Sequence, residues 1–208
     1  MQKNPRTRYY ARQVFTYTRN NAVVLVLSAL FLAGVLCATL AYGLLEPAAG
    51  EYLRAIVTDF ASARLTSPLR QNFISAVFSA FIFPAVLFIC GFCAVAQPVI
   101  ILVPFVRGLG VGFSLAALYA AYGSSAMGFA MLYLCGILPV AAAVLLSAVE
   151  SLRLSSGLFA AMRTGERASF YPPRKYFGRY SAFAVLCVLS AAMEAILYSV
   201  FANYVVLG

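Results

Sequence analysis

Histidine and tryptophan are both absent from this chain of 208 residues. Without histidine, His-based catalytic triads, HExxH metal sites and histidine proton relays are excluded. Charged residues are also scarce, at 10% of the sequence, whereas a soluble domain has about a quarter. So few charges cannot cover a water-soluble surface. With 63% hydrophobic residues and a mean hydropathy of +0.91, the chain is predicted to be an integral membrane protein.

Long runs without charge predict the number of membrane spans. About 20 apolar residues cross the hydrocarbon core as a helix, and Ala22–Leu45 is one such run. Gln71–Ala148 holds a single charge, Arg107, and has room for about three crossings. We therefore expect an all-α, polytopic membrane helix bundle over residues 22–208, preceded by a basic arm at 1–21. The five transmembrane helices are expected at about 22–45, 72–96, 99–122, 127–149 and 180–205.

The basic residues predict the orientation of the bundle. The arm carries five basic residues before the first span and no acidic one. The loop at 46–71 balances three acidic residues against three basic ones, and residues 153–179 carry six basic residues against Glu166 alone. Cytoplasmic segments are enriched in Lys and Arg. We expect the N-terminus and the basic loop at 150–179 inside, and the loop at 46–71 and the C-terminus outside.

The net charge of +9 has the same explanation. The basic residues flank membrane spans, where the anionic headgroups of the lipid bilayer are nearer partners than nucleic acid. With no tryptophan present, tyrosines are expected to form the interfacial belt, at Tyr17, Tyr42, Tyr122, Tyr176 and Tyr180.

The five cysteines lie inside the expected spans, where we interpret them as small packing residues. Cys90 and Cys93 have the spacing of a redox or metal pair, but no second ligand pair and no histidine accompany them. The others are Cys37, Cys135 and Cys187. We expect no metal, no cofactor and no enzymatic activity, because the spans offer only isolated carboxylates.

Small residues recur every four positions in the third expected span. Gly108, Gly112, Ala116 and Ala120 would form one ridge of a helix, where another helix backbone can approach closely. This spacing predicts that the third span is central to the bundle.

Two prolines mark the entry to that span. Pro98 and Pro104 bracket an apolar segment that precedes Arg107, and proline cannot donate to the helix ladder. We expect the chain to turn or break here on the cytoplasmic side. The alternatives are a short re-entrant segment of the kind that lines transporter sites and a kinked span entry with Arg107 reaching the headgroups. Glu150, at the end of the fourth span, is the expected ion-pair partner of Arg107.

The outer loop has the pattern of an amphipathic helix. Its apolar stripe consists of Leu53, Ile56, Val57 and Phe60. This helix is expected either to lie on the outer leaflet as a cap or to dock an extracytoplasmic partner.

Glu194 is the only charge in the last span. An unpaired carboxylate at membrane depth is costly, so we expect Glu194 to face the protein, protonated or hydrogen-bonded, and to attach the last helix to the bundle. Ser190 and Tyr198 share its helix face. A proton relay is the alternative role. The polar residues at matching depth on other spans are Thr39, Ser75, Ser79 and Tyr119.

Several segments in order give the chain a family resemblance. They are FLAGV (31–35), FVRGLGVGF (105–113), GILP (136–139), KYFGRYSAF (175–183) and AMEAILYS (192–199). With the basic arm and the short outer loop, they resemble the stage II sporulation protein M family over nearly the whole length. The chain departs from the pattern at Val140, where many relatives place a polar residue after the Leu-Pro of the fourth span.

The resemblance implies a non-enzymatic role in engulfment during endospore formation. Family members are thought to form a membrane scaffold for two peptidoglycan-degrading partners, the stage II sporulation proteins D and P. The alternative is a small permease or channel that uses a broken third span, Arg107 and Glu194. A permease of this size should show internal repeats or several polar residues at mid-membrane depth, and the sequence shows no repeat and one deep acid.

Overall fold

The computed structural model describes the backbone of residues 5–164 and 173–201, and the side chains of residues 22–163 and 174–200. Every regular element in these ranges is a helix. The six α-helices are α1 (Pro5–Tyr42), α2 (Pro47–Thr66), α3 (Leu69–Gly91), α4 (Gln97–Tyr122), α5 (Ala126–Thr164) and α6 (Pro173–Phe201), with a short 3-10 turn, η1 (Gly123–Ser125), between α4 and α5.

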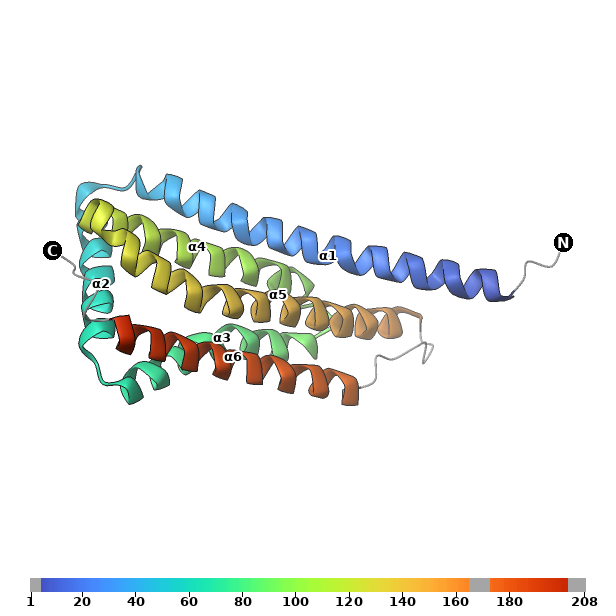
Figure 1. The fold of residues 1–208 in the computed structure, drawn as a ribbon. Helices are drawn as coiled ribbons and strands as arrows, with labels where there is room; N and C mark the ends of the chain where they lie inside the picture. Colours follow the sequence, from blue (N-terminus) through green and yellow to red (C-terminus); the bar gives the residue numbers. More distant parts are fainter. Residues whose placement is uncertain (1–4, 165–172, 202–208) are drawn as a thin grey trace.

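Five of these helices lie lengthwise beside one another, and α2 lies across one end of the bundle (Figure 1). The end of α1 and the C-terminal end of α6 lie at the α2 end, whereas the start of α1 and the end of α5 lie at the opposite end. α1 packs mainly on α4, while α3 packs mainly on α5 and α6. The segment expected as an outer amphipathic helix is therefore a helix that caps the bundle.

The outer surface of the bundle is apolar. Four helical stretches are long and apolar enough to cross a membrane, and one of them, Gln97–Arg163, contains both α4 and α5, folded back on each other at η1. Large apolar side chains on these helices are exposed, including Leu40, Phe78, Ile89 and Met131. Such exposure fits a lipid-facing surface. The predicted all-α class is confirmed, and the long apolar helices are compatible with a helical membrane bundle.

Two helices extend beyond the expected spans. α1 already begins at Pro5, inside the basic arm, and α5 continues past Glu150 to Thr164. The expected loop at 150–179 is therefore helical over most of its length. Glu150 and Arg153 pair at an i, i+3 spacing on α5, so charge does not end the helix there. Ser151 and Leu154 continue the buried face of α5.

The expected break near Arg107 does not occur. α4 is one continuous helix, with Pro98 in its first turn and Pro104 inside it. Proline is tolerated in the first turn because that N–H has no helical partner, and membrane helices accommodate an internal proline when neighbouring groups satisfy the freed carbonyl. The chain instead leaves the helix at residues 92–96, between α3 and α4.

α1 and α4 approach each other through glycines. A methyl group on Gly108 would overlap the carbonyl oxygen of Phe31, and one on Gly112 would lie 2.5 Å from the carbonyl oxygen of Val35. Gly34 on α1 fits the same way against the backbone of α4. The structure thus places Gly108 and Gly112 in a close helix contact.

The outer half of the expected ridge lies elsewhere. Ala116 is partly buried, and Ala120 is exposed, with its carbonyl oxygen accepting a hydrogen bond from Arg54.

Hydroxyl groups attach the end of α3 to α5 and α6. The Ser151 hydroxyl donates to the Leu87 carbonyl at 2.7 Å, and the Tyr176 hydroxyl donates to the Phe88 carbonyl at 3.0 Å. The last carbonyls of a helix have no partner within it. Ser155, which donates to the Cys93 carbonyl, extends the same contact past the helix end. This network fixes the end of the bundle opposite to α2.

Candidate functional site

Glu194 forms an ion pair with a residue from α2. Nη1 of Arg64 lies 3.0 Å from Oε1 of Glu194, and the two side chains are 5% and 13% exposed. The pair joins the capping helix to α6 in a nearly dry environment, where each charge compensates the other. Glu194 therefore faces the protein, as predicted, but its partner is a charge rather than a hydroxyl.

The turn between α2 and α3 holds Arg64 in place. The Asn72 side-chain amide donates to the Arg64 carbonyl at 2.8 Å, and the Arg64 guanidinium donates to the Asn72 carbonyl at 3.3 Å. The guanidinium also lies 5.0 Å from the ring centre of Phe60 and 5.8 Å from that of Tyr198. Both rings can attract a cation. These contacts hold the Arg64 guanidinium in the position in which it pairs with Glu194.

α5 provides the seat for Glu194. A methyl group on Gly136 would lie 2.9 Å from Cγ of Glu194, so a larger residue here would force the Glu194 side chain to shift. One turn earlier on α6, the Ser190 hydroxyl donates to the Gly136 carbonyl at 3.0 Å. Ser190 and Tyr198 are both buried, and the Tyr198 ring packs against Phe129. The expected buried polar face of the last helix is present around Glu194.

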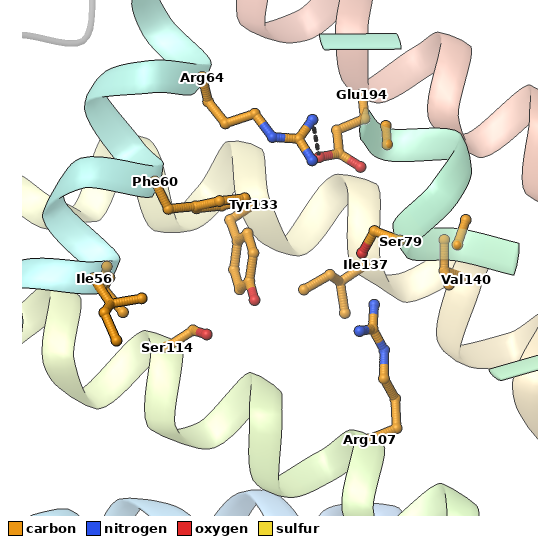
Figure 2. Close-up of a pocket in the computed structure, with 13 residues that line it drawn as sticks. Ile56, Phe60, Arg64, Ser79, Arg107, Ser114, Tyr133, Ile137, Val140 and Glu194 are labelled. Atoms are coloured by element: carbon orange, nitrogen blue, oxygen red, sulfur yellow. Dashed lines mark ion pairs between the residues drawn. The ribbon is translucent and has the colours of Figure 1, made fainter. Parts of the chain in front are cut away.

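A cavity of about 260 Å³ lies beside this ion pair (Figure 2). It is lined by residues of α2, α3, α4, α5 and α6. Its polar lining consists of Arg64, Ser79, Arg107, Ser114, Tyr133 and Glu194. Apolar side chains, among them Ile56, Phe60, Ile137 and Val140, complete the wall. Two arginines against one glutamate give this lining an excess of positive charge.

Arg107 extends from α4 into this cavity (Figure 2). Its guanidinium carbon lies 5.2 Å from the ring centre of Phe83 on α3. Arg107 follows the first residue of α4 by ten positions, about 15 Å along the helix. Its side chain points into the cavity between the helices, whereas the sequence-based expectation placed it among the headgroups.

The expected ion pair between Arg107 and Glu150 is not formed. Glu150 pairs with Arg153 at 2.5 Å and with Arg179 on α6. Glu150 lies on the α5 segment near the end opposite to α2, whereas Arg107 faces the cavity beneath α2. The prediction was wrong because it assumed a break in α4 that would have kept Arg107 close to the membrane surface.

The apolar stripe of α2 mainly faces the bundle. Val57 packs against the core cluster that includes Leu118 and Phe129. Ile56 and Phe60 line the cavity and remain partly exposed, and Leu53 is partly exposed as well. This arrangement uses much of the stripe to hold α2 on the bundle.

The other polar residues expected near Glu194 lie in different places. Ser79 lines the same cavity, whereas Ser75, Thr39 and Tyr119 are exposed, and the Thr39 hydroxyl donates to the Leu36 carbonyl of its own helix. The residues that sequence reasoning missed are Arg64, Asn72, Tyr133, Gly136 and Gly34. Arg64 could have been found, because it follows Phe60 by four positions and so continues the apolar stripe.

The cysteines form no site in the part of the chain that the structure describes. All five are free thiols there. Cys93 lies in the 92–96 connection and not inside a span, and Cys187 is the one that is fully buried. Among the described residues, no group of three or more His, Cys, Asp or Glu side chains could hold a metal ion.

The chain was compared with known protein families, curated proteins and solved structures. No protein-family model, curated protein or solved structure matches the chain.

Proposed function

We propose that the chain is a non-enzymatic scaffold of the bacterial cell membrane that positions extracytoplasmic partners. By the resemblance to the stage II sporulation protein M family, the partners are the peptidoglycan-degrading stage II sporulation proteins D and P, and the process is engulfment. The observation that carries the proposal is the rigid attachment of α2 across one end of the bundle.

Three contacts hold α2 in its position. Arg64 pairs with Glu194 on α6, and Arg54 donates to the Ala120 carbonyl of α4 at 2.8 Å. The Asn72 side chain closes the turn into α3. A helix fixed at both ends presents its remaining face in one orientation, which lowers the entropy cost of binding a partner. That face carries Tyr52, which is 70% exposed, and the exposed Asp59.

The scaffold requires α2 to lie outside the cell. The basic start of α1, the basic start of α6 and the end of α5 lie at one end of the bundle (Figure 1). The proposal counts α4 and α5 as separate crossings, which makes five. By the positive-inside rule the end with the basic segments is cytoplasmic.

We therefore expect reporter fusions after residues 20, 60, 165 and 208 to read inside, outside, inside and outside. The measurement is paired alkaline phosphatase and green fluorescent protein activity in a bacterial host. An external signal at 165 would contradict the orientation.

The outward face of α2 provides the test of the scaffold. Tyr52→Ser combined with Asp59→Lys should weaken co-purification of cell-wall hydrolases from sporulating cells by about tenfold, the effect of losing one strong interface contact. Met162→Ser, an exposed change at the opposite end of the bundle, is the control and should change nothing. Undiminished co-purification with the double variant, at equal membrane levels, would remove α2 as the docking element.

A small permease or channel is the second candidate, and the polar cavity favours it. The continuous α4 removes the broken helix on which that hypothesis first depended. Flux of a small anion into proteoliposomes that contain the purified chain would favour the permease, and normal co-purification without flux would favour the scaffold.

A further inference from the structure

The lining of the cavity beneath α2 carries two positive charges and one negative charge. Glu194 forms its close ion pair with Arg64 and attracts Arg107 only at longer range. Arg107 has no ion pair and no hydrogen bond to any residue that the structure describes, and its Nε is buried. A guanidinium cannot lose its proton under ordinary conditions, and a bare charge at this depth of a membrane protein is unfavourable. The geometry therefore calls for a negative charge beside Arg107.

The walls around Arg107 carry the right groups for an oxyanion. Ser79 on α3 and Tyr133 on α5 place hydroxyl groups on the cavity wall, and each of these hydroxyls can donate a hydrogen bond (Figure 2). The Ser114 hydroxyl on α4 already donates to the Gly110 carbonyl at 2.9 Å. A guanidinium binds phosphate through two parallel N–H donors. The two arginines and one glutamate of the lining leave a net charge of one positive unit, which matches a ligand with one negative charge. The cavity volume, about 260 Å³, leaves room for substituents on the oxyanion.

The rim of the cavity is suited to an amphiphile. Ile56 and Phe60 on α2 and Ser79 on α3 line the cavity and are also exposed, so the cavity reaches the outer surface between these two helices. One turn further along α3, Ile82 is 60% exposed. A polar group inside the cavity could thus continue into an apolar chain that lies along α3, on the surface that faces lipid.

We propose that this cavity binds a singly charged phosphate group, supplied by the headgroup of an anionic lipid. Arg107 binds the phosphate oxygens, and Tyr133 and Ser79 donate hydrogen bonds to it. The Arg64–Glu194 pair forms one wall and remains intact. The site is independent of the scaffold proposal, because it lies inside the bundle and not on the outward face of α2.

The test measures thermal stability of the full chain in a neutral detergent with added phosphatidylglycerol, phosphatidylcholine or inorganic phosphate. Phosphatidylglycerol should raise the melting temperature and phosphatidylcholine should not. The apparent affinity for phosphatidylglycerol should fall at least about tenfold in Arg107→Met, as expected for loss of a charged hydrogen-bond donor. Arg70→Met, which removes an exposed basic residue outside the cavity, is the matched control and should keep the response.

The other outcomes also decide the question. Stabilisation by inorganic phosphate that disappears in Arg107→Met keeps the phosphate site and assigns it to a soluble ligand. If wild type and Arg107→Met respond equally to phosphatidylglycerol, the proposal is overturned. Should Arg107→Met fail to fold, Tyr133→Phe and Ser79→Ala must each weaken the lipid response for the site to stand. The substitution Arg107→Met is itself expected to raise the melting temperature of the lipid-free protein, because it removes the uncompensated charge.

Discussion

Glu194→Leu is expected to lower the free energy of unfolding by about 3–5 kcal/mol, the usual cost of removing one partner of a buried ion pair. The substitution leaves Arg64 charged in a setting where its side chain is 5% exposed. Arg64 cannot move to solvent easily, because the Asn72 hydrogen bonds fix its turn. The measurement is denaturant or thermal unfolding of the purified protein in detergent.

A double-variant cycle separates the ion pair from simple loss of packing. Arg64→Met alone should also destabilise the protein, but the double variant Arg64→Met/Glu194→Leu should recover most of the loss, because neither charge is then buried alone. Arg54→Met, on the same helix but exposed, should change stability by less than about 1 kcal/mol. If the losses of the two single variants simply add in the double variant, the pair does not stabilise the bundle.

The charge at Glu194 was located correctly from the sequence, but its partner was not. The sequence predicts partners at the same depth on other spans, because the outer loop is expected to stay at the surface. In the structure α2 lies flat against the bundle end, and the long Arg64 side chain reaches Glu194 from there. The sequence shows that Arg64 follows Phe60 by four positions and so lies on the same face of α2. The tilt and height of a capping helix depend on tertiary packing, such as that of Val57 against the core.

The prediction for Arg107 was wrong because it expected a helix break that does not occur. Two prolines close to it predicted a broken helix, because each proline lacks a backbone donor. Pro98 lies where no donor is needed, and buried neighbours such as Ile100 and Val103 hold the helix through Pro104. Local propensity was therefore overridden by packing, and the charge ended inside the bundle. The helical class and the contact of Gly108 and Gly112 were predictable, since they depend on composition and on a four-residue spacing that any straight helix preserves.

The contact between α1 and α4 leads to the second large expected effect. Gly108→Leu should destabilise the protein by about 3 kcal/mol or more, at or above the upper end of typical overpacking. A side chain at Gly108 would meet the backbone carbonyl of Phe31, and a backbone cannot move aside as a flexible side chain can. The two helices would have to separate along their length. Unfolding in detergent, with folded yield as a second readout, measures the loss.

Gly110→Leu on the same helix is the matched control for this effect, because a methyl group at Gly110 meets nothing within 4 Å. It should change stability by no more than about 0.5 kcal/mol, as for other surface positions.

The contact is also reciprocal, since a methyl group on Gly34 would overlap the carbonyl oxygen of Phe105. Gly34→Ala should therefore destabilise the protein as well, and Gly34→Ala with Gly108→Ala should cost less than the sum of the two, because one separation of the helices relieves both overlaps. Equal stability of Gly108→Leu and Gly110→Leu would show that α1 and α4 do not pack through these glycines.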